Sequence, residues 1–108
     1  MAKIYERQLV LNVQRTFRFI LFVAGEEVNS NLARKNLANL CDELGGSCLC
    51  QVIDVMEDFE AAVEHQILLT PSLLILEPKP GALVVGNLSD LSRVEQVLGI
   101  DLRRRETA

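Results

Sequence analysis

The stretch Leu69-Thr70-Pro71-Ser72 decides how the chain is organised. Proline lacks an amide proton and has a fixed φ, so Pro71 cannot extend the amphipathic pattern that precedes it. It also biases Thr70 towards an extended backbone. The apolar residues 72–76 that follow are therefore predicted to form a strand.

The chain after this junction is predicted to form a hairpin and then a helix. A Pro-Lys-Pro-Gly turn and an apolar return strand occupy residues 78–85. Residues 91–98 carry an apolar stripe at helical spacing. Ser89 or Asp90 is the expected N-cap of this helix, and Gly99 lies near its expected end.

The chain before the junction is predicted to begin with a parallel strand pair. Residues 17–23 form an almost continuous apolar run, which indicates a strand buried on both faces. A helix is expected from an N-cap at Asn29 or Ser30 to about residue 44, where two glycines stop it. Residues 48–55 form the second strand, and the crossover makes the pair parallel and right-handed. The helix is expected to bury Ala33, Leu37, Leu40, Cys41 and Leu44.

A short acidic helix is predicted between the second strand and the Thr70-Pro71 junction. Its apolar face is expected to hold Phe59, Ala62, Val63 and Ile67. The element order is then βαβαββα, an α/β chain with a mixed four-stranded sheet and helices on both faces. This order is the thioredoxin-like arrangement. In redox thioredoxins the corresponding proline is cis, and we expect a cis bond here as well.

Length and composition indicate one domain without a membrane span. We assign residues 17–101 to that domain, 1–16 to an N-terminal extension that is an arm or an extra strand, and 102–108 to a polar tail. The formal charge of −4 argues against nucleic-acid binding. No apolar run approaches the roughly 20 residues of a membrane-spanning helix, and no signal-peptide pattern is present, so a cytoplasmic location is expected.

The sequence offers little that could carry catalysis. A thioredoxin places its nucleophilic cysteine just after the first long strand, but residues 25–30 contain no cysteine. Cys41, Cys48 and Cys50 form no Cys-x-x-Cys motif, and we expect ordinary buried cysteines. His65 is the only histidine and is expected on the surface or in an interface. We therefore predict no enzyme activity, no cofactor and no metal site.

Five short motifs follow one another along the predicted domain. They are Phe22-Val23-Ala24-Gly25 with Asn29-Ser30, Val52-Ile53-Asp54-Val55, Ile67-Leu68-Leu69-Thr70-Pro71-Ser72-Leu73, Gly86-Asn87-Leu88-Ser89 and Leu98-Gly99-Ile100-Asp101. Together they resemble the KaiB circadian-clock family, whose motifs include Y-V-A-G-x-x-x-N-S, I-L-A-T-P-T-L and G-D-L-S. The chain resembles a divergent KaiB-like paralogue. The related thioredoxin-like alternative is the N-terminal domain of the clock-output histidine kinase SasA.

The resemblance implies a binding protein without catalysis. KaiB proteins dock onto the ATPase KaiC, help to capture KaiA and displace SasA, so a KaiC-type ATPase, KaiA and SasA-like proteins are the implied partners. The family also implies two folds, a tetrameric ground state of order βαββααβ and a monomeric thioredoxin-like binding state. Local propensity in the hairpin and the last helix agrees with the second fold. We therefore expect a thioredoxin-like monomer to dominate, with the tetramer as the alternative.

The family motifs also imply which residues bind a partner or switch fold. The family's D-K pair is His65-Gln66 here, so a lysine expected to help bind KaiC is missing. An arginine-rich tail at residues 103–105 replaces the family's acidic tail, and the N-terminal extension is longer. The candidate residues are Ala24, Gly25, Asn29, Ser30, His65, Gln66, Thr70, Pro71, Gly99 and Asp101.

Two other functions stay open. The first is an interaction domain for a histidine kinase or a stress-signalling partner, bound through the same sheet edge and helix. The sequence does not separate this function from binding to a KaiC-type ATPase. The second is a thiol redox protein that uses Cys41, Cys48 or Cys50, and the residues favour it least.

Overall fold

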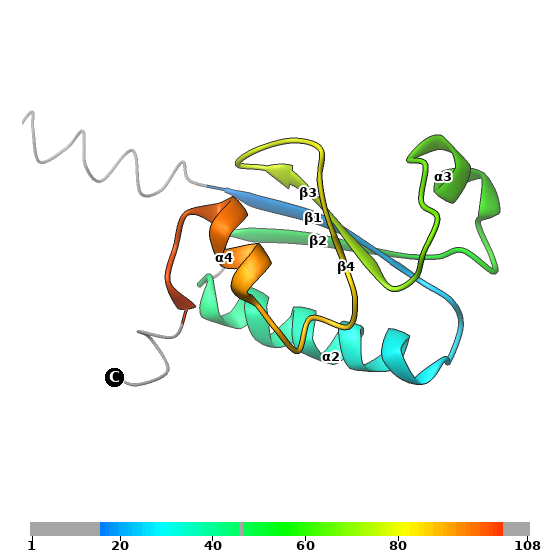
Figure 1. Cartoon of the computed structure of the whole chain (residues 1–108), viewed down its shortest axis with the longest axis horizontal. Coiled ribbons are helices and arrows are strands. Elements are labelled where there is room, and N and C mark those ends of the chain that lie inside the picture. Colours follow the sequence, from blue (N-terminus) through cyan, green and yellow to red (C-terminus); the bar gives the residue numbers. More distant parts are fainter. Residues whose placement is uncertain (1–15, 46, 103–108) are drawn as a thin grey trace, which may run out of the picture.

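A four-stranded sheet forms the centre of the fold (Figure 1). The computed structural model describes residues 16–45 and 47–102. The strands are β1 (Phe17–Val23), β2 (Cys48–Asp54), β3 (Ser72–Glu77) and β4 (Ala82–Val85), in the order β2-β1-β3-β4. β1 pairs in parallel with β2 and antiparallel with β3, and β3 pairs antiparallel with β4. The predicted thioredoxin-like order βαβαββα is confirmed.

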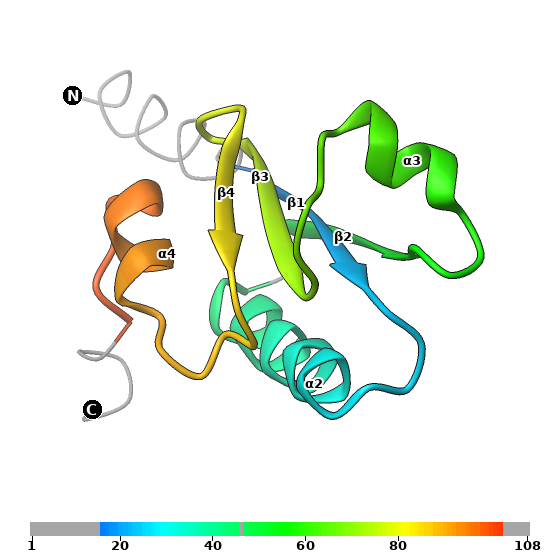
Figure 2. The ribbon, with the colours of Figure 1, turned by 45° about the vertical axis from the view of Figure 1, so that its right-hand side comes forward.

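The larger core lies between the sheet and two helices, α2 (Val28–Glu43) and α4 (Ser92–Leu98), as the turned view shows (Figure 2). α2 buries the predicted residues Ala33, Leu37 and Leu40, and Leu44 follows them at the C-cap. α4 adds Val94 and Leu98 to the same core. The odd-numbered residues of β1 supply the sheet side of this core: Phe17, Phe19, Leu21 and Val23.

The opposite face of the sheet carries a smaller core. Ile20 and Phe22 of β1 and Leu74 of β3 form its centre, so β1 is buried on both faces as predicted. The helix on this side is α3 (Phe59–Glu64), which has six residues and stands at one end of the sheet (Figure 1). Because so short a helix meets the core along one side only, Ala62 is its one buried residue.

The predicted apolar face of α3 was therefore wrong in two places. Phe59 and Val63 are 71% and 58% exposed, although they were expected to be buried with Ala62. Ile67 is half-buried against the smaller core, as predicted. Its N–H donates to the Ala62 carbonyl at 2.8 Å, which holds the chain close to the helix it has just left.

The helix starts were also predicted incorrectly. Neither Asn29 nor Ser30 caps α2, because the helix begins at Val28 and the Glu27 carboxylate accepts the N–H groups of both residues. α4 begins after Leu91, which makes no side-chain cap bond. The Asp90 carboxylate, one residue before the N-cap, instead accepts the Ser92 N–H at 3.0 Å.

Several expectations concern parts of the chain at its ends. Residues 1–15 and 103–108, which hold most of the predicted extension and of the predicted polar tail, lie outside the described residues. Leu102 was assigned to the polar tail, which was wrong, because it is buried in the larger core. Gly99 ends α4 in a left-handed conformation with φ of 70°, as its position predicted. Among the helices of the described part, none is long and apolar enough to cross a membrane.

Candidate partner-binding surface

Four connections meet at one end of the sheet. The parallel strands β1 and β2 end there, β4 ends there, and β3 begins there. The Val55 N–H donates to the Val23 carbonyl at 2.8 Å, and the Gly86 N–H donates to the Pro71 carbonyl at 2.9 Å. These bonds hold the four connections in one loop end, which comprises residues 24–30, 55–58, 65–71 and 86–89.

The Ala24-Gly25 turn is fixed from two sides. The Ala24 N–H donates to Ser30 Oγ at 3.0 Å, and Ser30 is fully buried. The Gly25 N–H donates to Asp54 Oδ1 at 3.0 Å across the β1–β2 pair. Gly25 has a φ of +54°, a left-handed conformation that glycine adopts without a Cβ penalty. The Ala-Gly motif is therefore explained by a turn in which each backbone amide has an assigned acceptor.

Asp54 organises this turn, and sequence reasoning did not single it out as a site residue. Its carboxylate also accepts the Met56 N–H at 2.9 Å. The Gly25 N–H, then the Met56 N–H, and more weakly the Arg34 guanidinium lower the pKa of the Asp54 carboxyl below 3.8. A signal was present in the sequence, because an aspartate at the end of a buried parallel strand faces the loop that follows the neighbouring strand.

The start of α2 joins this end through Glu27 and Asn29. Glu27 accepts the N–H groups of Asn29 at 2.8 Å and Ser30 at 3.2 Å. The Asn87 side-chain amide donates to Asn29 Oδ1 at 3.0 Å, and the Asn36 amide donates to the Asn87 carbonyl at 2.8 Å. Asn29 therefore connects α2 to the loop that leaves β4.

The segment between α3 and β3 contains the other four candidates of this end. His65 is the C-cap of α3, and its exposed ring lies 5.5 Å from the ring of Phe22, centroid to centroid. Gln66 takes a left-handed φ of 57°. The Thr70–Pro71 bond is cis, as predicted. The hydroxyl of buried Ser72 donates to the Leu69 carbonyl at 2.6 Å, which attaches the segment to the first residue of β3.

Exposed apolar side chains border these anchored loops. We call residues 56–69 the α3 segment. Its exposed large hydrophobic residues, with the exposed fraction of each, are Met56 76%, Phe59 71%, Val63 58%, Leu68 91% and Leu69 62%. Exposed apolar side chains of this size are candidates for contact with a partner.

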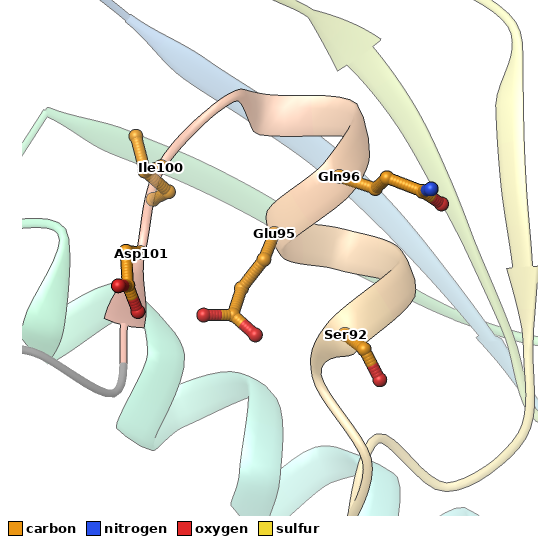
Figure 3. Close-up of a pocket in the computed structure, with 5 residues that line it drawn as sticks. All are labelled: Ser92, Glu95, Gln96, Ile100 and Asp101. Atoms are coloured by element: carbon orange, nitrogen blue, oxygen red, sulfur yellow. The ribbon is translucent and has the colours of Figure 1, made fainter.

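Gly99 and Asp101 do not belong to this loop end. They follow α4, which Figure 1 places at the other end of the sheet. Asp101 lines an open hollow of about 550 Å³ together with Ser92, Glu95, Gln96 and Ile100. Figure 3 shows these five side chains. The Glu95 carboxylate accepts the Leu102 N–H at 2.8 Å, so the segment after α4 folds back on the helix.

The three cysteines were predicted to be ordinary buried residues, and this was wrong. Cys41 and Cys48 are half-buried and Cys50 is exposed. Their sulfur atoms converge between the end of α2 and the start of β2, at the end of the sheet opposite the loop end. Sequence reasoning placed Cys48 and Cys50 on one face of their strand, but the spacing alone does not show that Cys41 lies above them.

Comparison with known proteins assigns the family. A profile described as the KaiB domain matches residues 20–100. The chain belongs to the KaiB family. It is 38% identical over 98 residues to a protein named circadian clock oscillator protein KaiB from Rippkaea orientalis, covering 90% of this chain and 92% of that one. The protein of the same name from Nostoc punctiforme is 37% identical, with 90% and 92% of the two chains covered. The predicted resemblance is confirmed.

Solved structures show the same fold. The N-terminal domain of SasA from Synechococcus elongatus matches with a TM-score of 0.59 and 21% identity, over 79% of this chain and 78% of that domain. Mitochondrial thioredoxin 3 from Saccharomyces cerevisiae matches with a TM-score of 0.65 and 17% identity, over 82% of each chain. At these identities the likeness concerns the fold, which is thioredoxin-like as predicted.

Proposed function

We propose that this KaiB-family chain is a non-catalytic protein that binds a KaiC-type ATPase or another clock-related signalling partner. The observation that carries the proposal is the α3 segment, whose apolar residues are exposed beside loops anchored by hydrogen bonds. Four relatives, each covered over 90% or more of its length, share the name circadian clock oscillator protein KaiB, which supports a clock-related role. KaiA and SasA-like proteins are the further partners that this role implies.

The side chains of the loop end fit binding better than catalysis. The hydroxyl groups of Ser30 and Ser72 are buried and engaged with neighbouring groups of the loops. The His65 ring packs beside Phe22. These groups therefore hold the surface in shape, while Leu68 and Leu69 are left to contact a partner.

The test is co-elution with a KaiC-type ATPase from the same cell, with and without nucleotide. Leu68→Ser and Leu69→Ser remove exposed apolar groups and should weaken binding at least tenfold while leaving the unfolding midpoint unchanged. Leu49→Ser is the matched control, because Leu49 is 59% exposed but lies at the far end of β2, opposite Arg18. Equal loss of binding in all three variants, or no complex with the wild-type chain, would count against the proposal.

A second candidate is an interaction domain for a histidine kinase or a stress-signalling partner. The fold match to the SasA N-terminal domain favours it. A pull-down from source lysate with the wild-type chain and Leu68→Ser as bait separates the two functions. Enrichment of a kinase that depends on Leu68, with no KaiC-type ATPase among the captured proteins, would favour the second candidate.

The thioredoxin-like monomer is proposed as the main state at rest. In the family's other fold, part of the hairpin of β3 and β4 would have to be helical. Backbone chemical shifts across residues 72–76 should therefore be those of a strand, and light scattering should give the mass of one chain. Helical shifts in this range, or a tetramer, would refute the proposal about the resting state and leave the binding proposal in place.

A further inference from the structure

The end of α2 and the start of β2 bring three cysteine sulfurs together. Cys41 is in the last turns of α2, and Cys48 and Cys50 occupy the β2 positions paired with Phe17 and Phe19. Since Phe17 and Phe19 face α2, Cys48 and Cys50 share that face. Cys48 Sγ lies 2.7 Å from Cys41 Sγ and 3.4 Å from Cys50 Sγ, and all three sulfurs lie within 4.8 Å of one another.

Once the three sulfurs are reduced, the spacing of their backbone suits a bridging ion. Cys48 is the free thiol, while Cys41 and Cys50 are paired as a disulfide, which a dithiol reductant must first open to two thiols. Their Cα atoms stand 7.9 Å apart, whereas most disulfides span about 4.4–6.8 Å between Cα atoms. A bound cation bridges wider spacings, because each sulfur then lies about 2.3 Å from the ion instead of bonding to the other sulfur.

We propose that Cys41, Cys48 and Cys50, when reduced, form a binding site for one thiophilic d10 cation, either Zn²⁺ or Cu⁺. Thiolates are soft ligands that select these ions, whereas Mg²⁺ and Ca²⁺ prefer oxygen. Three sulfurs satisfy trigonal Cu⁺ completely. Zn²⁺ prefers four ligands, so it would take one further ligand, such as water, beside the three sulfurs.

Each thiol must lose its proton to bind an ion, and that proton goes to solvent. In the described part of the chain, these three cysteines are the one group of ligand residues close enough to hold an ion.

The experiment measures ion binding by the full chain after reduction, under oxygen-free conditions. Zn²⁺ and Cu⁺ are titrated separately in competition with a chromophoric chelator, and Co²⁺ is added as a probe of thiolate ligation by its charge-transfer absorption. The variants are Cys41→Ser, Cys48→Ser and Cys50→Ser. Ser47→Ala is the matched control, because Ser47 adjoins the cluster in the sequence and offers no sulfur.

The expected result is one ion bound per chain in at least one of the two titrations. The ion that binds more tightly is then the preferred ligand of the site. Each cysteine variant should lose about tenfold or more in affinity, and Ser47→Ala should bind like the wild type. The Co²⁺ band of the wild-type chain supplies a readout that does not depend on how the variants fold. No ion bound in either the Zn²⁺ or the Cu⁺ arm, or a Cys48→Ser variant that binds as tightly as the wild type, would overturn the proposal. Either outcome leaves the proposed binding function untouched, because the cluster lies at the other end of the sheet.

Discussion

Replacing Ser30 with alanine tests whether the Ala24-Gly25 turn depends on one buried hydroxyl. Ser30 is fully buried, and its Oγ accepts the Ala24 N–H at 3.0 Å while donating to Glu27 Oε1 at 3.3 Å. Alanine fills nearly the same space but has no oxygen. The Ala24 N–H then loses its acceptor at a half-buried position. The substitution therefore changes hydrogen bonding and leaves apolar packing almost intact.

The expected loss in the free energy of unfolding is about 1–2 kcal/mol, the lower part of the range for an unpaired buried donor, because the Ala24 N–H is half-buried. A domain of this size loses roughly 4–8 °C of melting temperature per kcal/mol, so Tm should fall by about 4 °C or more. This loss of free energy is a sizeable part of the 5–15 kcal/mol typical of folded domains, but it should not abolish folding. Affinity for a partner should fall as well, because the turn shapes the loop end.

The assay is urea and thermal unfolding followed by circular dichroism, with a reductant present so that the cysteines do not alter the reference state. Ser89→Ala is the control, because Ser89 is exposed and only its backbone N–H bonds, to Asn87 Oδ1 at 3.0 Å. Surface changes of this kind stay within about 0.5 kcal/mol. If Ser30→Ala lost no more stability than Ser89→Ala, the assignment of the turn to the Ser30 hydroxyl would be wrong.

Three further predictions concern single groups. Gly25→Ala should lower the unfolding free energy by about 1–2 kcal/mol in thermal unfolding. The cost comes from the backbone, whose φ is +54°, and not from a clash, because a Cβ would meet nothing within 4 Å. Gly25→Asn should cost less, because asparagine tolerates this conformation better. Because the pKa of Asp54 is lowered from 3.8, its carboxylate stabilises the fold above pH 3.8, and this stability is lost as pH falls through the lowered pKa. The difference in unfolding free energy between the wild type and Asp54→Asn should therefore disappear in acid. A difference that does not change with pH would contradict this. In a Cys41→Ser/Cys50→Ser variant, iodoacetamide should label Cys48 slowly near neutral pH and faster up to about pH 11, and a rate like that of an exposed thiol would contradict the effect of burial.

The strands could be predicted from the sequence because their residues obey local rules. The apolar run at β1 requires burial on both faces, and that is how Leu21 and Phe22 lie. The proline in Thr70-Pro71 marks the start of β3 to within one residue. The helical stripe of α2 gives the correct buried face. In each case a short window of sequence contains the information that determines the element.

The errors have two causes. The cap of α2 was missed because a glutamate took an uncommon role: the Glu27 carboxylate reaches forward to the N–H groups of Asn29 and Ser30, which are themselves the commoner cap residues. The other error depends on a distant neighbour. The cysteine cluster depends on the tilt of α2 over β2, which the spacing of Cys41 from Cys48 does not encode. A parallel strand–helix–strand unit does place the end of its helix above the start of its second strand, so the approach could have been anticipated from topology.

The misprediction of α3 also bears on the proposed function. Phe59 and Val63 have the spacing of a buried stripe, yet the sheet offers this short helix only the edge of the core around Ile20 and Phe22. A helix with so few buried contacts contributes little to stability, so its exposed apolar groups need a different explanation from packing. Binding to a partner supplies one, since the same groups would be buried in the complex. If so, Phe59→Ser should weaken partner binding as Leu68→Ser does while leaving the unfolding free energy within about 0.5 kcal/mol of the wild type. A loss of stability without a loss of binding would instead assign Phe59 to the fold.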